Sequence, residues 1–69
     1  MKMFDANSTL IARYGYDPKS GELDIEFHSG GTWRYSGVRQ DAFTAFLQAP
    51  SKGKYFLANI KLAYEATRL

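Results

Sequence analysis

The sequence has no cysteine and a single histidine, His28, among its 69 residues. Disulfides and thiolate metal sites are therefore excluded, and one histidine does not favour a zinc site made from protein ligands alone. No apolar run approaches the roughly 20 residues that cross a bilayer, and the first residues carry no signal-peptide pattern. We therefore expect a cytoplasmic domain with no metal, no cofactor and no membrane partner.

The chain is short, and this limits how it can be stabilised. A domain of this size buries only about 60% of the surface that its unfolded chain exposes. Five Phe, five Tyr and one Trp must therefore supply most of the core. The predicted organisation is a flexible N-terminus over residues 1–7 and a single domain over residues 8–69. Formation of a homo-oligomer would add buried surface, and the sequence leaves it open.

The formal net charge is +2, and its distribution along the chain is uneven. Residues 1–31 carry three basic and five acidic side chains, a net charge of −2. Residues 32–69 carry six basic and two acidic side chains, a net charge of +4. A basic second half favours an anionic partner, although a solvated helix face has a similar composition.

Three segments have the alternation of apolar and polar residues that predicts strands, namely residues 10–16, 22–28 and 32–36. The turn Pro18–Gly21 separates the first two, because proline presets φ and glycine accepts a positive φ. A second turn, Ser29–Gly31, leads into the third strand. The prediction is an antiparallel meander of three strands.

The charged residues allow the register of this meander to be predicted. With the first turn at Pro18–Gly21, Arg13 lies opposite Glu26. With a three-residue second turn, Glu26 lies opposite Arg34, and Trp33 lies opposite Phe27. Both registers place the apolar side chains on one face and the row Arg13, Glu26 and Arg34 on the other. We expect ion pairing across this row.

The second half of the chain has the periodicity of two helices. Phe43, Phe46 and Leu47 recur at helical spacing within residues 38–48. Pro50 ends this helix, because the residue before a proline avoids the α region, and Ser51 is a good N-cap for the next helix. The apolar positions predicted for that second helix are Phe56, Ile60, Ala63 and Tyr64. Two helices packed on one face of a three-stranded sheet predict an α+β fold, in the order β-β-β-α-α.

A set of residues with defined spacing runs from Ile11 to Tyr64. Its members are Ile11, Gly15-Tyr16-Asp17, Leu23, Ile25, Phe27, Gly31, Trp33, Tyr35, Gly37-Val38, Phe43, Leu47, Ala49, Ser51, Gly53, Tyr55-Phe56, Ile60 and Tyr64. This pattern resembles the KTSC domain, a short module found as a stand-alone bacterial or phage protein and behind some lysyl-tRNA synthetases. RNA binding has been suggested for the family, largely from that fusion.

Three positions depart from the family pattern. Trp33 replaces the first tyrosine of the central Tyr-x-Tyr, Arg39 replaces a proline, and Leu57 replaces a residue that is commonly polar. The resemblance implies the α+β fold and, through the synthetase fusion, an interaction with RNA.

The sequence does not predict an enzyme. A hydrolase requires a nucleophile, a base and a group that orients the base, and His28 has no second polar cluster to complete such a set. We interpret His28 as a solvated residue at a hairpin tip. Trp33 and Tyr35 resemble a base-stacking platform, but they share the face that the two helices must cover. We therefore expect both rings to pack in the core.

The segment Ser51-Lys52-Gly53-Lys54-Tyr55 is the candidate binding site. A helix N-terminus presents unpaired amides and a partial positive charge that suit a phosphate. Two lysines there oppose helix formation, and Gly53 leaves the backbone uncovered. Arg39 joins the site if the two helix N-termini lie close together, and Tyr55 or Trp33 would stack on a base. The alternative interpretation is a helix cap and a tight packing point.

The predicted function is a non-enzymatic module that binds RNA or another nucleic acid through this basic helix N-terminus. One alternative is a small protein that binds a nucleotide at the same helix end. Another is a protein-interaction module, in which Leu57 is an exposed contact.

Overall fold

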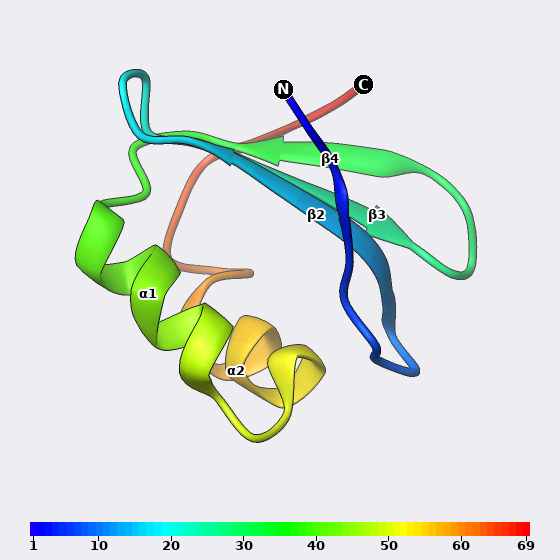
Figure 1. The fold of residues 1–69 in the computed structure, drawn as a ribbon. Coiled ribbons are helices and arrows are strands. Elements are labelled where there is room, and N and C mark those ends of the chain that lie inside the picture. Colours follow the sequence, from blue (N-terminus) through cyan, green and yellow to red (C-terminus); the bar gives the residue numbers. More distant parts are fainter.

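The structure, a computed structural model, describes residues 1–69. The three alternating segments form the centre of an antiparallel sheet as β2 (Ile11–Asp17), β3 (Glu22–Phe27) and β4 (Thr32–Tyr35). Two helices, α1 (Gln40–Gln48) and α2 (Lys52–Asn59), follow and cover one face of the sheet (Figure 1). The predicted α+β class, with two helices packed on an antiparallel sheet, is confirmed.

The sheet has five strands, so the predicted number of three is wrong. β1 (Phe4–Asp5) pairs with β2 at one edge, and β5 (Ala66–Arg68) pairs with β4 at the other. The strand order is β1-β2-β3-β4-β5. Strands of two and three residues are too short to show alternation, and their pairing depends on neighbours that lie far away in the sequence.

The two added strands come from segments that the sequence pattern places elsewhere. β1 lies within residues 1–7, for which a flexible terminus is predicted; its mobility stays a prediction. α2 ends at Asn59, whereas the apolar spacing predicts a helix that extends to Tyr64. Ala63 is exposed, because the chain leaves the helix after Ile60 and returns to pair with β4.

The first hairpin has the predicted register, with Arg13 opposite Glu26. The second hairpin is shifted by two residues from the prediction, so that Arg34 lies opposite Asp24. Its loop runs through residues 28–31, and Gly30 and Gly31 adopt φ values of 104° and 85° that favour glycine. A shift of two residues keeps every side chain on its face, so the apolar pattern does not distinguish the two registers.

The altered register changes the ion pairs on the open face. Asp24 is buried and accepts two hydrogen bonds from Arg34, at 2.8 and 2.9 Å. Arg13 pairs separately with Glu26 at 2.7 Å. The predicted continuous row of three charges is therefore two separate pairs, each of which neutralises its arginine.

The core lies between the sheet and the two helices. Its largest fully buried side chains are Phe46, Phe56, Ile11, Leu23, Ile25, Ile60 and Val38. Tyr35 is buried as expected, with 5% of its surface exposed, whereas Trp33 is only half-buried near the edge of the sheet. Neither helix has the length and apolar character of a membrane-spanning segment.

Candidate functional site

The N-terminus of α2 is formed by the local sequence Pro50-Ser51. Ser51 has an extended backbone, and its Oγ accepts a hydrogen bond from the amide of Lys54 at 3.2 Å. The predicted N-cap is therefore confirmed. The amides of Lys52 and Gly53 lie in the first turn, where no residue of the helix can accept their hydrogen bonds. These two donors and the partial positive charge of the helix end would both stabilise an anion bound at this position.

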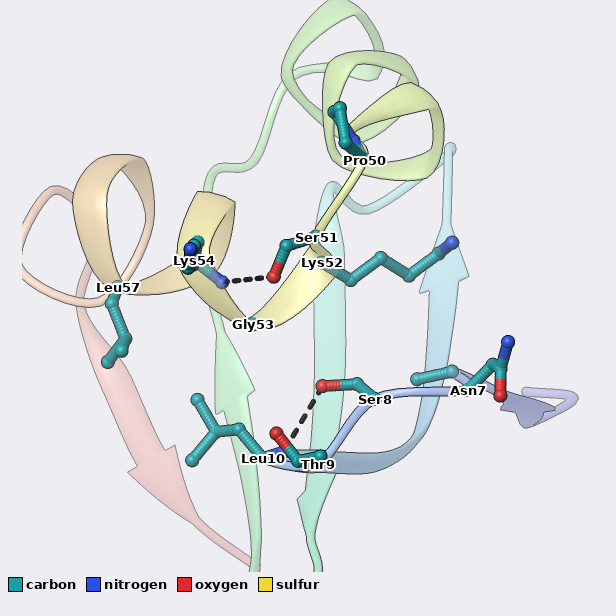
Figure 2. Close-up of a pocket in the computed structure, with 11 residues that line it drawn as sticks. Asn7, Ser8, Thr9, Leu10, Pro50, Ser51, Lys52, Gly53, Lys54 and Leu57 are labelled. Atoms are coloured by element: carbon teal, nitrogen blue, oxygen red, sulfur yellow. Dashed lines mark hydrogen bonds between the residues drawn. The ribbon is translucent and has the colours of Figure 1, made fainter.

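A hollow of about 480 Å³ lies between this helix end and the loop that precedes β2. We call it the lysine hollow; it is lined by residues 6–10, residues 50–54 and Leu57. Figure 2 shows Ser8 and Leu10 facing the first turn of α2. Lys52 and Lys54 are the only charged residues among those that line it, and no lining residue is acidic.

The loop wall of the lysine hollow is held by Ser8. Its Oγ accepts hydrogen bonds from the amides of Leu10 at 3.1 Å and Ile11 at 3.2 Å. His28 donates a hydrogen bond from Nε2 to the carbonyl oxygen of Ser8 at 2.7 Å. Asn7 adopts a positive φ of 51°, which asparagine tolerates better than most residues. His28 is exposed, but its bond to Ser8 ties the second hairpin to this loop.

The sequence pattern does not identify this wall, which begins at residues 6–7 of the predicted flexible terminus and continues through residues 8–10 of the predicted domain. The run Asn7-Ser8-Thr9 contains the only available signal, since serine and asparagine side chains often bond to nearby backbone amides. That signal predicts a turn, but not its position beside α2. The position depends on the hydrogen bond from His28 and on the packing of Gly53.

Gly53 is buried where α2 approaches the loop. A Cβ atom at this position would lie 3.2 Å from Ser8 Oγ and 3.3 Å from Leu10 Cβ. Both distances are shorter than comfortable contacts, so glycine allows the helix to approach the loop closely. This geometry supports the packing interpretation of Gly53. The same close approach brings the two lysines and the Ser8 loop to a single hollow.

The remaining predicted site residues lie away from the lysine hollow. Arg39 precedes α1, is exposed and forms an ion pair with Asp41 at 3.5 Å. With Tyr55 and Tyr64 it lines a separate hollow, so the expectation that Arg39 joins the lysines is not met. A ligand that contacts Arg39 or Tyr55 as well as the two lysines must therefore be long enough to reach from one hollow to the other.

Trp33 lines a third surface, which we call the apolar groove. Its lining residues are Leu10, Phe27, Trp33, Tyr35, Phe56, Leu57, Lys61, Leu62 and Ala66. The groove has a volume of about 440 Å³, and Leu10 and Leu57 line both the groove and the lysine hollow. Trp33 therefore lines a surface that shares Leu10 and Leu57 with the lysine hollow, but it does not line the hollow itself.

The arginines of the open face are engaged elsewhere. The hydrogen bonds that Arg34 donates to Asp24, together with the charge of that carboxylate, raise the pKa of Arg34. Arg34 is thus fully charged and paired with Asp24, and Arg13 is paired with Glu26. The lysine hollow is the place where cationic side chains gather without an acidic partner.

Comparisons with known proteins agree with the pattern found in the sequence. The family model described as the KTSC domain matches residues 7–64. An uncharacterized protein from Stutzerimonas stutzeri (strain A1501) is 38% identical over 56 residues, which cover 81% of this chain and 79% of that protein. The crystal structure of a KTSC domain protein from Yersinia pestis matches with a TM-score of 0.95 and 34% identity. That match covers 99% of this chain and 96% of the other.

Proposed function

The chain belongs to the KTSC domain family, and we propose that it is a non-enzymatic module that binds RNA or another nucleic acid through the lysine hollow. The observation that carries this proposal is the charge of the hollow. Lys52 and Lys54 lie beside the N-terminus of α2, and none of the other lining residues is acidic. A phosphate in the hollow meets two cations, two free amides and the positive end of the helix.

The polar residues of the opposite wall support a nucleic acid rather than a bare anion. Asn7, Ser8 and Thr9 bring amide and hydroxyl groups to the side of the hollow that faces the lysines. Such groups bond to phosphate oxygens and to sugar hydroxyls. A ribonucleotide that places its phosphate at Lys52 and Lys54 therefore finds polar partners for its ribose across the hollow.

The residues that line the hollow also support a binding role without catalysis. They include no histidine and no carboxylate that acts as a general base. His28 donates its Nε2 hydrogen to the Ser8 carbonyl from outside the hollow. In our proposal the module acts by phosphate contact, and Arg39, Tyr55 and Trp33 are contacts for a strand that extends beyond the hollow.

We test this with fluorescence anisotropy of a labelled single-stranded RNA of mixed sequence, over a range of salt concentrations. Each phosphate contact on a single strand adds about −0.7 to the slope of log K against log salt. The double variant Lys52→Ala with Lys54→Ala should bind roughly tenfold more weakly at low salt, and its slope should be smaller by about 1.4.

The matched control is Lys2→Ala with Lys19→Ala, which removes the same charge from residues that do not line the hollow. It should keep most of the affinity, since any loss through net charge alone affects both double variants equally. Undetectable RNA binding at low salt, or binding that does not respond to salt, contradicts the proposal.

A single nucleotide is the second candidate ligand, because the volume of the hollow falls within the roughly 300–1,000 Å³ that small-molecule sites occupy. Calorimetry with a panel of mononucleotides and cyclic nucleotides separates the two candidates. One tight, stoichiometric nucleotide would favour a nucleotide-binding protein, whereas weak binding to all of them, combined with tighter binding to longer RNA, favours the nucleic acid.

A further inference from the structure

Both sulfur atoms of the chain lie at one position on the sheet. Met1 and Met3 are the only methionines, and the chain has no cysteine. A Cβ atom at Gly15 would lie 2.7 Å from Met3 Sδ and 2.9 Å from Met1 Sδ. The two thioethers therefore fill the space that a side chain of residue 15 would occupy. Methionine suits such a position, because its unbranched side chain adapts to irregular space.

These sulfur atoms also lie beside a buried charge. Asp24 lies directly opposite Gly15 and keeps only 5% of its surface exposed, although the two helices cover the other face of the sheet (Figure 1). Residues that are directly opposite in an antiparallel pair are close neighbours on one face. Because Gly15 has no side chain, the N-terminal residues that lie over it supply the cover on this side of Asp24.

We propose that Met1 and Met3 form an oxidation site that controls whether the N-terminal segment stays on the sheet. Met1 is 54% exposed and Met3 is half-buried, so a small oxidant such as hydrogen peroxide can reach the sulfur atoms. The sulfur forms a bond to one peroxide oxygen while the O–O bond breaks. A proton moves to the departing oxygen, which leaves as water, so that the sulfur loses two electrons and the peroxide gains them.

The product is a sulfoxide, which is polar and chiral where the thioether was apolar. Its oxygen requires a hydrogen-bond donor. The backbone oxygen of Lys2, which would lie 2.7 Å from a Cβ atom at Gly15, and the carboxylate of Asp24 are both acceptors. The donors of Arg34 that face this carboxylate are already engaged, at 2.8 and 2.9 Å. The sulfoxide therefore finds its donors in water, and the segment leaves Gly15.

Release of this segment reaches the lysine hollow through β1. Ala6 and Asn7 directly follow β1 and line the hollow, and the amide of Ala6 bonds to the carbonyl oxygen of Ala12 at 3.1 Å. Oxidation therefore loosens one wall of the hollow. A methionine sulfoxide reductase, with a dithiol as the reductant, restores the thioethers and the wall. This link to binding rests on the proposed function, whereas the oxidation and the release do not.

The experiment is amide hydrogen exchange of the intact chain before and after treatment with hydrogen peroxide. Mass spectrometry counts the oxygen atoms that are added. Exchange at Ala6 should become about tenfold faster once both sulfur atoms are oxidised. The amides of β3 should keep their rates, and treatment with the reductase should restore slow exchange at Ala6.

The matched control carries Met1→Leu and Met3→Leu, and is made by chemical synthesis so that residue 1 can be changed. Leucine has a volume similar to that of methionine and no sulfur to oxidise. Peroxide should therefore leave exchange at Ala6 unchanged in this control. A further variant, Met3→Gln, introduces a polar side chain in place of a thioether and should show fast exchange at Ala6 without any peroxide.

The proposal fails if both sulfur atoms carry oxygen and exchange at Ala6 is unchanged, or if the leucine control responds to peroxide as the wild type does. It also fails if Ala6 exchanges rapidly before treatment, because the segment is then not held on the sheet.

The link to the lysine hollow is measured with the labelled RNA. The oxidised wild type should bind RNA more weakly than the leucine control does after the same treatment, and equal affinity would overturn this link. An unoxidised chain that binds no RNA contradicts the proposed function alone, since the exchange measurement needs no ligand.

Discussion

At the scale of single residues, Tyr16 connects the sheet to the first helix. Its hydroxyl donates a hydrogen bond to the carbonyl oxygen of Val38 at 2.6 Å, and its ring stacks on Phe43 with centroids 4.2 Å apart. Burial raises the pKa of Tyr16, and the charges of Asp17 and Asp41 raise it further. The folded chain therefore holds the phenol proton more tightly than the unfolded chain does.

The variant Tyr16→Phe keeps the stacked ring and removes the hydrogen bond. We expect a loss of about 1 kcal/mol in the free energy of unfolding at neutral pH. A tyrosine in the unfolded chain ionises near about pH 10. Because the folded pKa of Tyr16 is raised, its contribution is fully present below that pH and is lost as pH rises through the folded pKa.

Denaturant unfolding at several pH values checks both effects. The wild type should lose more stability than Tyr16→Phe above about pH 10. Burial also raises the pKa of Tyr35, so the stability of both proteins still decreases somewhat at high pH. Tyr14→Phe is the control, since it retains the ring contacts with Phe43 and Phe46. An equal alkaline loss in wild type and Tyr16→Phe would show that Tyr16 is not the linked group.

At the scale of elements, the segment that leads into β1 is packed against a glycine of β2. A Cβ atom at Gly15 would lie 2.7 Å from the backbone oxygen of Lys2 and 2.7 Å from Met3 Sδ. Neither distance is possible for a real side chain, and the first of these atoms belongs to the backbone. The residues that precede β1 can therefore lie over β2 only because residue 15 has no side chain.

The variant Gly15→Ala should displace the N-terminal segment from the sheet. We expect a loss of about 1–3 kcal/mol in stability, with faster hydrogen exchange at the amide of Ala6, which bonds to Ala12 at 3.1 Å. The amides of β3, on the far side of β2, should remain protected and act as the internal control. Rapid exchange at Ala6 in the wild type would instead support a mobile N-terminus.

At the scale of the whole molecule, the last residues complete the sheet. β5 makes β4 an interior strand, and backbone hydrogen bonds join Ser36 to Glu65 at 2.9 Å and Leu69 to Thr32 at 2.8 Å. Each such bond contributes about 0.5–1.5 kcal/mol. The total free energy of unfolding of a chain this size is only about 3–10 kcal/mol. The hydrogen bonds of a three-residue strand therefore contribute a large share of it.

Removal of residues 65–69 should therefore lower the melting temperature strongly and expose the ring of Trp33 to water. We expect the tryptophan emission to shift to longer wavelength, measured by fluorescence and circular dichroism at low protein concentration. Thr67→Ala is the control, because Thr67 lies opposite Arg34 on the open face and its change keeps the strand. If the truncated chain has the same melting temperature as the wild type, β5 contributes little to stability.

The success of the sequence-based predictions differs between the two hairpins for a physical reason. Pro18 and Gly21 specify the first turn, and alternation on both sides then defines its register. Gly30 and Gly31 permit loops of more than one length. Arg34 lies opposite an acidic residue in both registers, Glu26 in the predicted one and Asp24 in the observed one. Both registers satisfy the apolar pattern. The ion pair that forms is Arg34 with Asp24, which is buried and accepts two hydrogen bonds from Arg34. The alternation of apolar and polar residues does not predict this burial.

The candidate site was predicted in part. The capping chemistry of Ser51 is local, and the structure confirms it. The loop wall around Ser8 and the separation of Arg39 and Trp33 from the lysines depend on how helices and strands pack. Neither follows from spacing along the chain.

The order of residues alone determined the α+β class, the first hairpin and the capped start of α2, because each depends on contacts between near neighbours or on a repeating pattern. Packing in three dimensions determined the edge strands β1 and β5, the lysine hollow and the apolar groove. These features join segments such as residues 6–10 and 50–54, which are distant in the chain and individually show no periodicity. Their contacts are favourable only after the core has brought both segments together.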